Sequence, residues 1–180
     1  MIPSRKQYGT VAGPHPRTVQ VGMDMLKAGG NAIDAAIAAA FAEGVVEPSQ
    51  NGIAGYGGCM VIYLAERQEV TAVDYNTVAP MASSDQMFPI QKADGPAGYH
   101  VPGRTNIHGP LSVGVPGVVA GLCLALQEFG RLPLAQILQP AIQSARYGFV
   151  PNRSNLNGIA TNADRWRRDF PETARVYLKN

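Results

Sequence analysis

The sequence has few charged residues and almost no charge imbalance. Only 16% of its 180 residues are Asp, Glu, Lys or Arg, and the formal net charge at pH 7 is +2. Surfaces that bind nucleic acid or anionic membranes depend on clustered positive charge. The composition therefore argues against both kinds of partner and favours a small neutral or anionic ligand. At 46% hydrophobic residues, the chain is long enough for one globular domain with a core, over residues 1–180.

Cysteine is scarce, and histidine lacks the spacing of metal ligands. Cys59 and Cys123 each lie in an apolar run, so burial as small hydrophobic side chains accounts for both without a disulfide. The three histidines, His15, His100 and His108, lie in expected loops, and neither they nor the cysteines have metal-site spacing. We therefore expect no metal site, no cofactor and a reducing compartment.

Long hydrophobic runs are absent. Residues 1–16 carry early charge but no apolar run of signal-peptide length. No window approaches the roughly 20 apolar residues that a membrane span needs. If Met1 is the natural start, these absences predict a cytoplasmic protein.

Apolar periodicity predicts a helical hairpin near the start of the chain. Residues 17–28 repeat apolar side chains at helical spacing, and Gly29 and Gly30 end that helix. A second, alanine-rich helix starts at Asn31, and Asp34 follows three residues on, where it favours the helix N-terminus. Its small side chains predict burial on more than one side.

Strand signals and further helix signals follow. Residues 59–65 and 69–75 are rich in β-branched and aromatic residues, and Glu66-Arg67-Gln68 separates them, which predicts a β-hairpin. Residues 81–110 form a long polar segment. Further helices are expected at 118–129, at 134–147 with a break or kink at Pro140, and from Asn152 past Trp166. The predicted fold class is α/β (α+β), a helical hairpin followed by a β-hairpin and further helices.

Four glycines, Gly52, Gly55, Gly57 and Gly58, precede the first expected strand. A phosphate-binding loop runs from a strand into a helix, so that the helix N-terminus faces the phosphate, and this cluster has a different order. Backbone packed closely against other backbone is the preferred explanation. No nucleophile-elbow pattern and no paired carboxylates stand out, so the residues alone predict no catalytic residue in this chain.

The stretch VDYNTVAP, residues 73–80, has the pattern of a strand that ends in a loop. Asn76 lies at that end. A polar side chain there either contacts a substrate or caps the turn, since Asn is common in turns and loops often carry binding residues. The residues alone leave both roles open.

Five sequence blocks occur in order within residues 9–155. They are AGGNAIDAAIAAAFAEGVVEP, NGIAGYGGCMVIY, VDYNTVAP, SVGVPGVVAGLCLAL and LPLAQILQPAIQSARYGF. Together they resemble the N-terminal part of the large subunit of the γ-glutamyltransferase (γ-glutamyltranspeptidase) family. The resemblance implies the N-terminal-nucleophile (Ntn) hydrolase fold, an αββα sandwich, of which this chain would form a part.

In the family that the chain resembles, a precursor cleaves itself into a large and a small subunit. The new N-terminal Thr of the small subunit attacks a γ-glutamyl or related amide, and such a hydroxyl nucleophile needs a nearby base and fixed oxyanion donors. Residues 1–180 contain no Thr-Thr-His stretch of the kind that marks the cleavage point. We therefore expect an incomplete N-terminal segment of a precursor, inactive by itself.

The partners that the resemblance implies are a small-molecule amide substrate and the missing C-terminal segment or small subunit. The alternative is a non-catalytic binding or scaffolding module derived from the same family.

The resemblance also gives Asn76 a possible function. In the transpeptidases, the block similar to VDYNTVAP carries an Arg that holds the α-carboxylate of the γ-glutamyl group, and the shared Ala79-Pro80 aligns Asn76 with it. A charged hydrogen bond is worth about 1.5 to 3 kcal/mol, whereas an Asn amide offers a neutral donor and acceptor. A smaller or less anionic acyl group would suit Asn76. Arg104 is either a replacement cation for the substrate or a solvated loop arginine.

Overall fold

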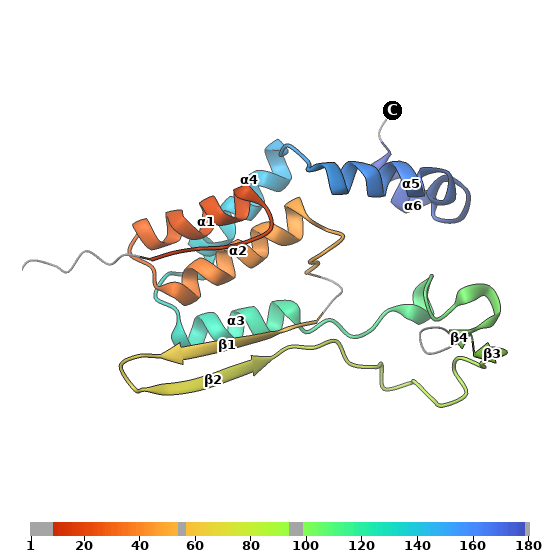
Figure 1. The fold of residues 1–180 in the computed structure, drawn as a ribbon, viewed down its shortest axis with the longest axis horizontal. Helices are drawn as coiled ribbons and strands as arrows, with labels where there is room; N and C mark the ends of the chain where they lie inside the picture. The colour runs from red at the N-terminus through yellow and green to blue at the C-terminus, as the bar shows by residue number, and fades with distance from the viewer. Residues whose placement is uncertain (1–8, 54–56, 94–98, 179–180) are drawn as a thin grey trace, which may run out of the picture. The chain divides into compact units, whose positions relative to one another are not determined.

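The computed structural model describes residues 9–53, 57–93 and 99–178, so residues 1–8 and Gly55 of the sequence interpretation lie outside the described part (Figure 1). The chain is mixed α/β, with two helices, a β-hairpin and four further helices. It divides into two compact units. The helical unit comprises the described parts of Met1–Gly52 and Glu128–Asn180, and the hairpin unit those of Ile53–Gln127. No helix in the described ranges is long and apolar enough to cross a membrane.

The helical unit is built around α2 (Ala32–Val46), which packs against both α1 (Pro16–Lys27) and α4 (Leu134–Tyr147) (Figure 1). The predicted helical hairpin and the burial of its second helix on more than one side are thus confirmed. The core of the unit is aliphatic with one aromatic ring, and includes Val21, Met25, Ile37, Ala38, Phe41, Val46, Ile137 and Ala141.

A buried carboxylate ties the start of α2 to the segment before α4. Asn31 caps α2, its side chain accepting from the amides of Ile33 and Asp34, and the Asp34 side chain accepts from the Asn31 amide at 2.7 Å. Asp34 is fully buried and also accepts from the amides of Arg131 and Leu132, each at 3.0 Å. The cap predicted at this helix start is therefore also a long-range connection.

Pro140 lies inside α4, and the helix continues through it as Leu134–Tyr147. Of the predicted break or kink, the break is therefore wrong. Proline removes one backbone donor from a helix. The buried face of α4 contains Ile137, Ala141 and Ser144, on both sides of the proline, and this packing keeps the helix in one piece.

A second polar connection holds α5 (Arg153–Asp169), which is followed by α6 (Pro171–Tyr177). Asn152 caps α5, and its side-chain amide donates to the Glu47 carboxylate. The side chain of buried Asn155 donates to the carbonyl of Val46 at 2.7 Å. The end of α2 is thus joined to the start of α5 by asparagine side chains.

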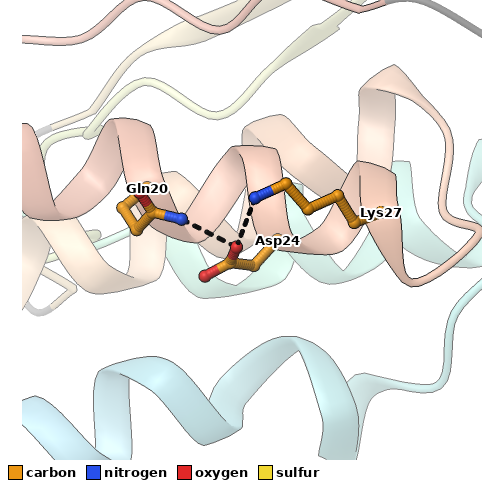
Figure 2. Close-up of polar contacts among 3 residues, drawn as sticks. All are labelled: Gln20, Asp24 and Lys27. Carbon is orange, nitrogen blue, oxygen red and sulfur yellow. Dashed lines mark hydrogen bonds and ion pairs between the residues drawn. The ribbon is translucent and has the colours of Figure 1, made fainter.

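The outer surface of α1 carries a small polar cluster of a different kind. Figure 2 shows Asp24 accepting from the Gln20 side-chain amide at 2.8 Å and from the Lys27 ammonium at 3.4 Å. All three groups lie in solvent. Side-chain pairs three and four residues apart each stabilise a helix by only about 0.2 to 0.5 kcal/mol.

The hairpin unit contains the predicted β-hairpin. Strands β1 (Cys59–Leu64) and β2 (Glu69–Asp74) are antiparallel, with Cys59 opposite Asp74. Beyond them lie the short strands β3 (Lys92–Ala93) and β4 (Tyr99–His100), the 3-10 turns η2 (Pro102–Arg104) and η3 (Pro110–Ser112), and α3 (Val118–Phe129), which this unit includes up to Gln127.

The two faces of β1 differ in exposure. Ile62 is buried, whereas Val61 and Tyr63 are 70% and 63% exposed. Cys59 lies on the exposed face as a free thiol, so its predicted burial is wrong, and Cys123 is partly exposed and also free. The error arose because an apolar run does not show which of two alternating faces a strand residue occupies.

Candidate substrate-binding site at the end of strand β2

Backbone hydrogen bonds fix the chain on both sides of Asn76. The Tyr75 amide donates to the Gly58 carbonyl at 2.9 Å. The Asn76 amide donates to the Asp74 carboxylate at 3.0 Å, which forms a local turn. Two residues further on, Val78 and Val115 exchange hydrogen bonds of 3.4 and 2.9 Å as an isolated bridge. Hydrogen bonds therefore fix the backbone conformation of the strand end, although it lies outside the β1–β2 ladder.

Glycines surround this strand end so closely that side chains would not fit. A Cβ at Gly57 would lie 2.2 Å from the Thr77 nitrogen and 2.4 Å from the Asn76 Cα. We call Gly57, Gly58, Gly114, Gly117 and Gly121 the glycine cradle, because each of them would place a Cβ within 3.0 Å of an atom of residues 75–77. The predicted close packing of backbone against backbone is confirmed for Gly57, whereas the atoms nearest Gly58 belong to the Tyr75 ring.

Tyr75 fills the space that two of these glycines leave. A Cβ on Gly121 in α3 would lie 2.3 Å from the Tyr75 Cβ, and one on Gly58 would lie 2.9 Å from its Cε2. The residue is half-buried. Burial raises the pKa of the Tyr75 phenol, with a smaller contribution from the Cys59 thiol, so the ring is neutral at physiological pH.

The Asn76 side chain itself is exposed and makes no hydrogen bond with another residue in the described ranges. The turn is capped by the carboxylate of Asp74, and Asn76 takes part through its backbone amide. The amide group of Asn76 is thus available, on a rigid support, as one donor group and one acceptor.

Arg104 ends η2 with a backbone φ of 53° and is exposed. Its side chain makes no hydrogen bond or ion pair with residues in the part of the chain that the structure describes. Arg104 therefore makes no hydrogen bond with Asn76 in the structure, and its predicted role in binding the substrate stays a prediction.

The sequence interpretation did not identify Tyr75, Asp74 or Gly121 as parts of this site. Gly121 carried a usable signal, because glycine inside a helix costs stability and is retained where another group approaches the helix closely. The identity of the approaching group could not be read from the chain, since Tyr75 and Gly121 are far apart in sequence.

The helical unit has a separate open groove of about 670 Å³. Alanines of α2 and the stretch Gly9–Pro14 line it, together with Glu43. Glu43 is buried, and its Oε1 has no hydrogen-bond partner among the described residues. Burial raises the pKa of the Glu43 carboxyl and neighbouring Glu47 raises it further, while a hydrogen bond from Thr18 and the charge of His15 oppose this.

The described residues contain no group of three or more His, Cys, Asp or Glu side chains placed to hold a metal ion. The chemical groups that the strand end offers are one neutral amide, one turn-capping carboxylate and a half-buried phenol. Such a set can bind and orient a polar substrate.

The chain is similar to two groups of enzymes. It is 36% identical over 159 residues to the glutathione hydrolase proenzyme of Escherichia coli (strain K12), which covers 88% of this chain and 26% of that protein. It is 40% identical over 167 residues to the acylase ACY 1 proenzyme of Pseudomonas sp. (strain SE83), which covers 93% of this chain and 30% of that protein. The chain thus spans less than a third of the length of these relatives.

Structural similarity agrees with this result. The γ-glutamyltranspeptidase crystal structure from Helicobacter pylori superimposes with a TM-score of 0.81 at 32% identity, over 93% of this chain and 46% of that chain. The family profile described as "Gamma-glutamyltranspeptidase" matches residues 18–180. The chain therefore belongs to the gamma-glutamyltranspeptidase family of Ntn hydrolases and corresponds to the N-terminal portion of the large subunit.

Proposed function

We propose that the chain is the N-terminal segment of an amidohydrolase that cleaves an acyl amide through an N-terminal Thr outside residues 1–180. Membership of a family that includes glutathione hydrolases and acylases supports this reaction class. In the proposed enzyme the Thr hydroxyl attacks the amide carbonyl, an acyl-enzyme forms, and water releases the acid. The described residues contribute binding and orientation of the acyl group.

We further propose that Asn76 contacts the acyl group and that this group is less anionic than γ-glutamyl. The observation that carries the proposal is the exposed Asn76 side chain on a fixed strand end, which makes no hydrogen bond with the residues that the structure describes, while Asp74 caps the turn. A carboxylate bound there would gain a neutral hydrogen bond in place of the charged, bidentate contact that Arg gives in the transpeptidases. A neutral polar acyl substituent has no charge to pair with Arg, so its binding is not weakened when Asn replaces Arg.

The test compares hydrolysis of a γ-glutamyl anilide and of a simple acyl amide by the full-length enzyme. Wild type should prefer the simple amide. Asn76→Arg should shift the kcat/KM ratio toward the γ-glutamyl substrate by about tenfold or more, because a charged hydrogen bond is worth about 1.5 to 3 kcal/mol.

Asn157→Arg is the matched control for this test, since Asn157 is an exposed residue of α5 in the helical unit. It makes the same substitution on a different element, α5, and should leave the ratio unchanged. An unchanged ratio in Asn76→Arg would show that position 76 does not determine specificity.

A second candidate function is a non-catalytic binding module. The exposed apolar residues Val61, Tyr63 and Val70 on the hairpin argue against it, because free monomers rarely leave such surfaces uncovered. Reading the coding sequence onward from Asn180 discriminates the two. A Thr-Thr-His region in frame supports the enzyme. A stop codon there, with no small-subunit gene nearby and a monodisperse, cooperatively unfolding product, supports the module.

A further inference from the structure

We infer that Tyr75 is a positioning residue, whose ring, seated between Gly58 and Gly121, sets the direction in which the Asn76 side chain leaves the strand end. This inference rests on the proposed role of Asn76 in substrate binding. Tyr75 needs no contact with substrate for it, because its effect reaches the site through the backbone.

Tyr75 is fixed from two directions. Gly58 lies just before β1 and Gly121 lies in α3, and both approach the Tyr75 side chain within the distance that a Cβ would occupy. The Gly58 carbonyl also accepts the Tyr75 amide hydrogen at 2.9 Å. Side chain and backbone of Tyr75 are therefore held by the same two neighbouring segments.

The fixed position of Tyr75 also restricts the backbone of Asn76. A Cβ on Gly117 would lie 2.6 Å from the Tyr75 carbonyl oxygen, so the peptide group that joins Tyr75 to Asn76 rests against the start of α3. Peptide groups are planar and rigid. With that plane fixed and the Asn76 amide bonded to Asp74, the Cα–Cβ direction of Asn76 has little freedom.

A neutral Asn amide needs such support more than an Arg side chain does. An Arg fork can reach a carboxylate through a long flexible stem, whereas Asn has a short side chain with two rotatable bonds. The backbone must therefore supply the placement. A binding group held on a rigid support loses less entropy when the substrate binds.

The test uses Tyr75→Ala and Tyr75→Phe in the natural full-length protein, with Tyr63→Ala as the matched control. Tyr63 is 63% exposed on the same hairpin. The first readout is amide hydrogen exchange. Tyr75→Ala should speed exchange at Tyr75, Asn76 and Val78 by about tenfold, without changing the β1–β2 ladder, because local openings can be independent of the surrounding structure.

Tyr75→Phe keeps the ring and should exchange like wild type, as should Tyr63→Ala. Unchanged exchange at Asn76 in Tyr75→Ala would overturn the inference. Faster exchange throughout the hairpin unit would also overturn it, because Tyr75 would then be a general packing residue.

The second readout separates this inference from the proposed function. Tyr75→Ala should raise KM for the preferred amide by about tenfold with kcat nearly unchanged, the pattern for loss of a binding contact made equally in ground and transition states, and Tyr75→Phe should restore KM. If KM does not move in Tyr75→Ala while Asn76→Arg still shifts the substrate ratio, only the Tyr75 inference fails. If neither variant has an effect, the proposed role of Asn76 fails as well.

Discussion

The two units of the chain hold their segments in place by opposite means. In the helical unit, buried side chains reach out to distant backbone, as Asp34 does to the amides of Arg131 and Leu132. In the hairpin unit, side chains are missing where segments meet, and the strand end lies directly on the glycine cradle. The helical unit depends on hydrogen bonds that must be satisfied. The hairpin unit depends on glycines without a Cβ, so that residues 75–77 can approach their backbone. The two should therefore fail under different substitutions.

The largest effect is expected from Asp34→Ala. It leaves the backbone amides of Asn31, Arg131 and Leu132 without their acceptor, and each hydrogen-bond donor left unsatisfied costs about 1 to 3 kcal/mol where it is shielded from water. Because three donors lose the same acceptor, the sum should exceed that of any other substitution considered. Urea unfolding measures the loss. A cost below 1 kcal/mol would show that water replaces the carboxylate, and that the connection is not essential to the helical unit.

The cradle is tested by Gly121→Ala. The new Cβ would lie 2.3 Å from the Tyr75 Cβ, and overpacking of this kind costs about 1 to 3 kcal/mol. Gly158→Ala in α5 is the matched control, since nothing lies within 4 Å of a Cβ there. Alanine is the better helix former, so the control should gain about 0.5 to 1 kcal/mol. If both substitutions changed the free energy of unfolding in the same direction, close packing would not distinguish Gly121 from Gly158.

A pH-dependent effect is expected from Glu43→Gln. The pKa of Glu43 is raised in the folded chain by burial, so this carboxyl favours folding while protonated and loses that contribution as pH rises through its folded pKa. The variant should therefore be more stable than wild type at neutral pH, with the difference shrinking as the pH falls toward the ordinary pKa of glutamate. Thermal unfolding between pH 4 and 7.5 measures this, with exposed Glu128→Gln as control. A difference that grows toward low pH would contradict it.

The smallest effect is expected from Asp24→Ala on the surface of α1. It removes the contacts with Gln20 and Lys27, which together contribute less than about 1 kcal/mol in solvent. Urea unfolding at low and high salt measures the change. A cost comparable to that of Asp34→Ala would mean that burial does not distinguish the two aspartates.

The helices and the hairpin could be predicted because their signals are local. Asn31 and Asp34 form a helix cap within four residues. The polar residues up to Gln68 separate two β-rich runs, and in the structure Gln68 has the positive φ, 53°, of a turn residue. The continuation of α4 through Pro140 could not be predicted in this way, because packing of Ile137 and Ala141 outweighs the local preference of proline.

The candidate site was predictable only in part for the same reason. Asn76 is a candidate from its place at a strand end and from the family resemblance, and its contact with substrate stays a prediction. Tyr75 and Gly121 depend on contacts between distant segments, and single-sequence patterns do not report such contacts.

The glycine cradle has a consequence for how specificity can change in evolution. The atoms of residue 76 nearest to these glycines belong to its backbone, and Asn76 is exposed. The residue can therefore be exchanged at little cost to folding, whereas the glycines around it cannot. With the proposed role of Asn76, a single codon would then alter the preferred acyl group while the scaffold stays the same, which makes position 76 a suitable place to test by directed evolution.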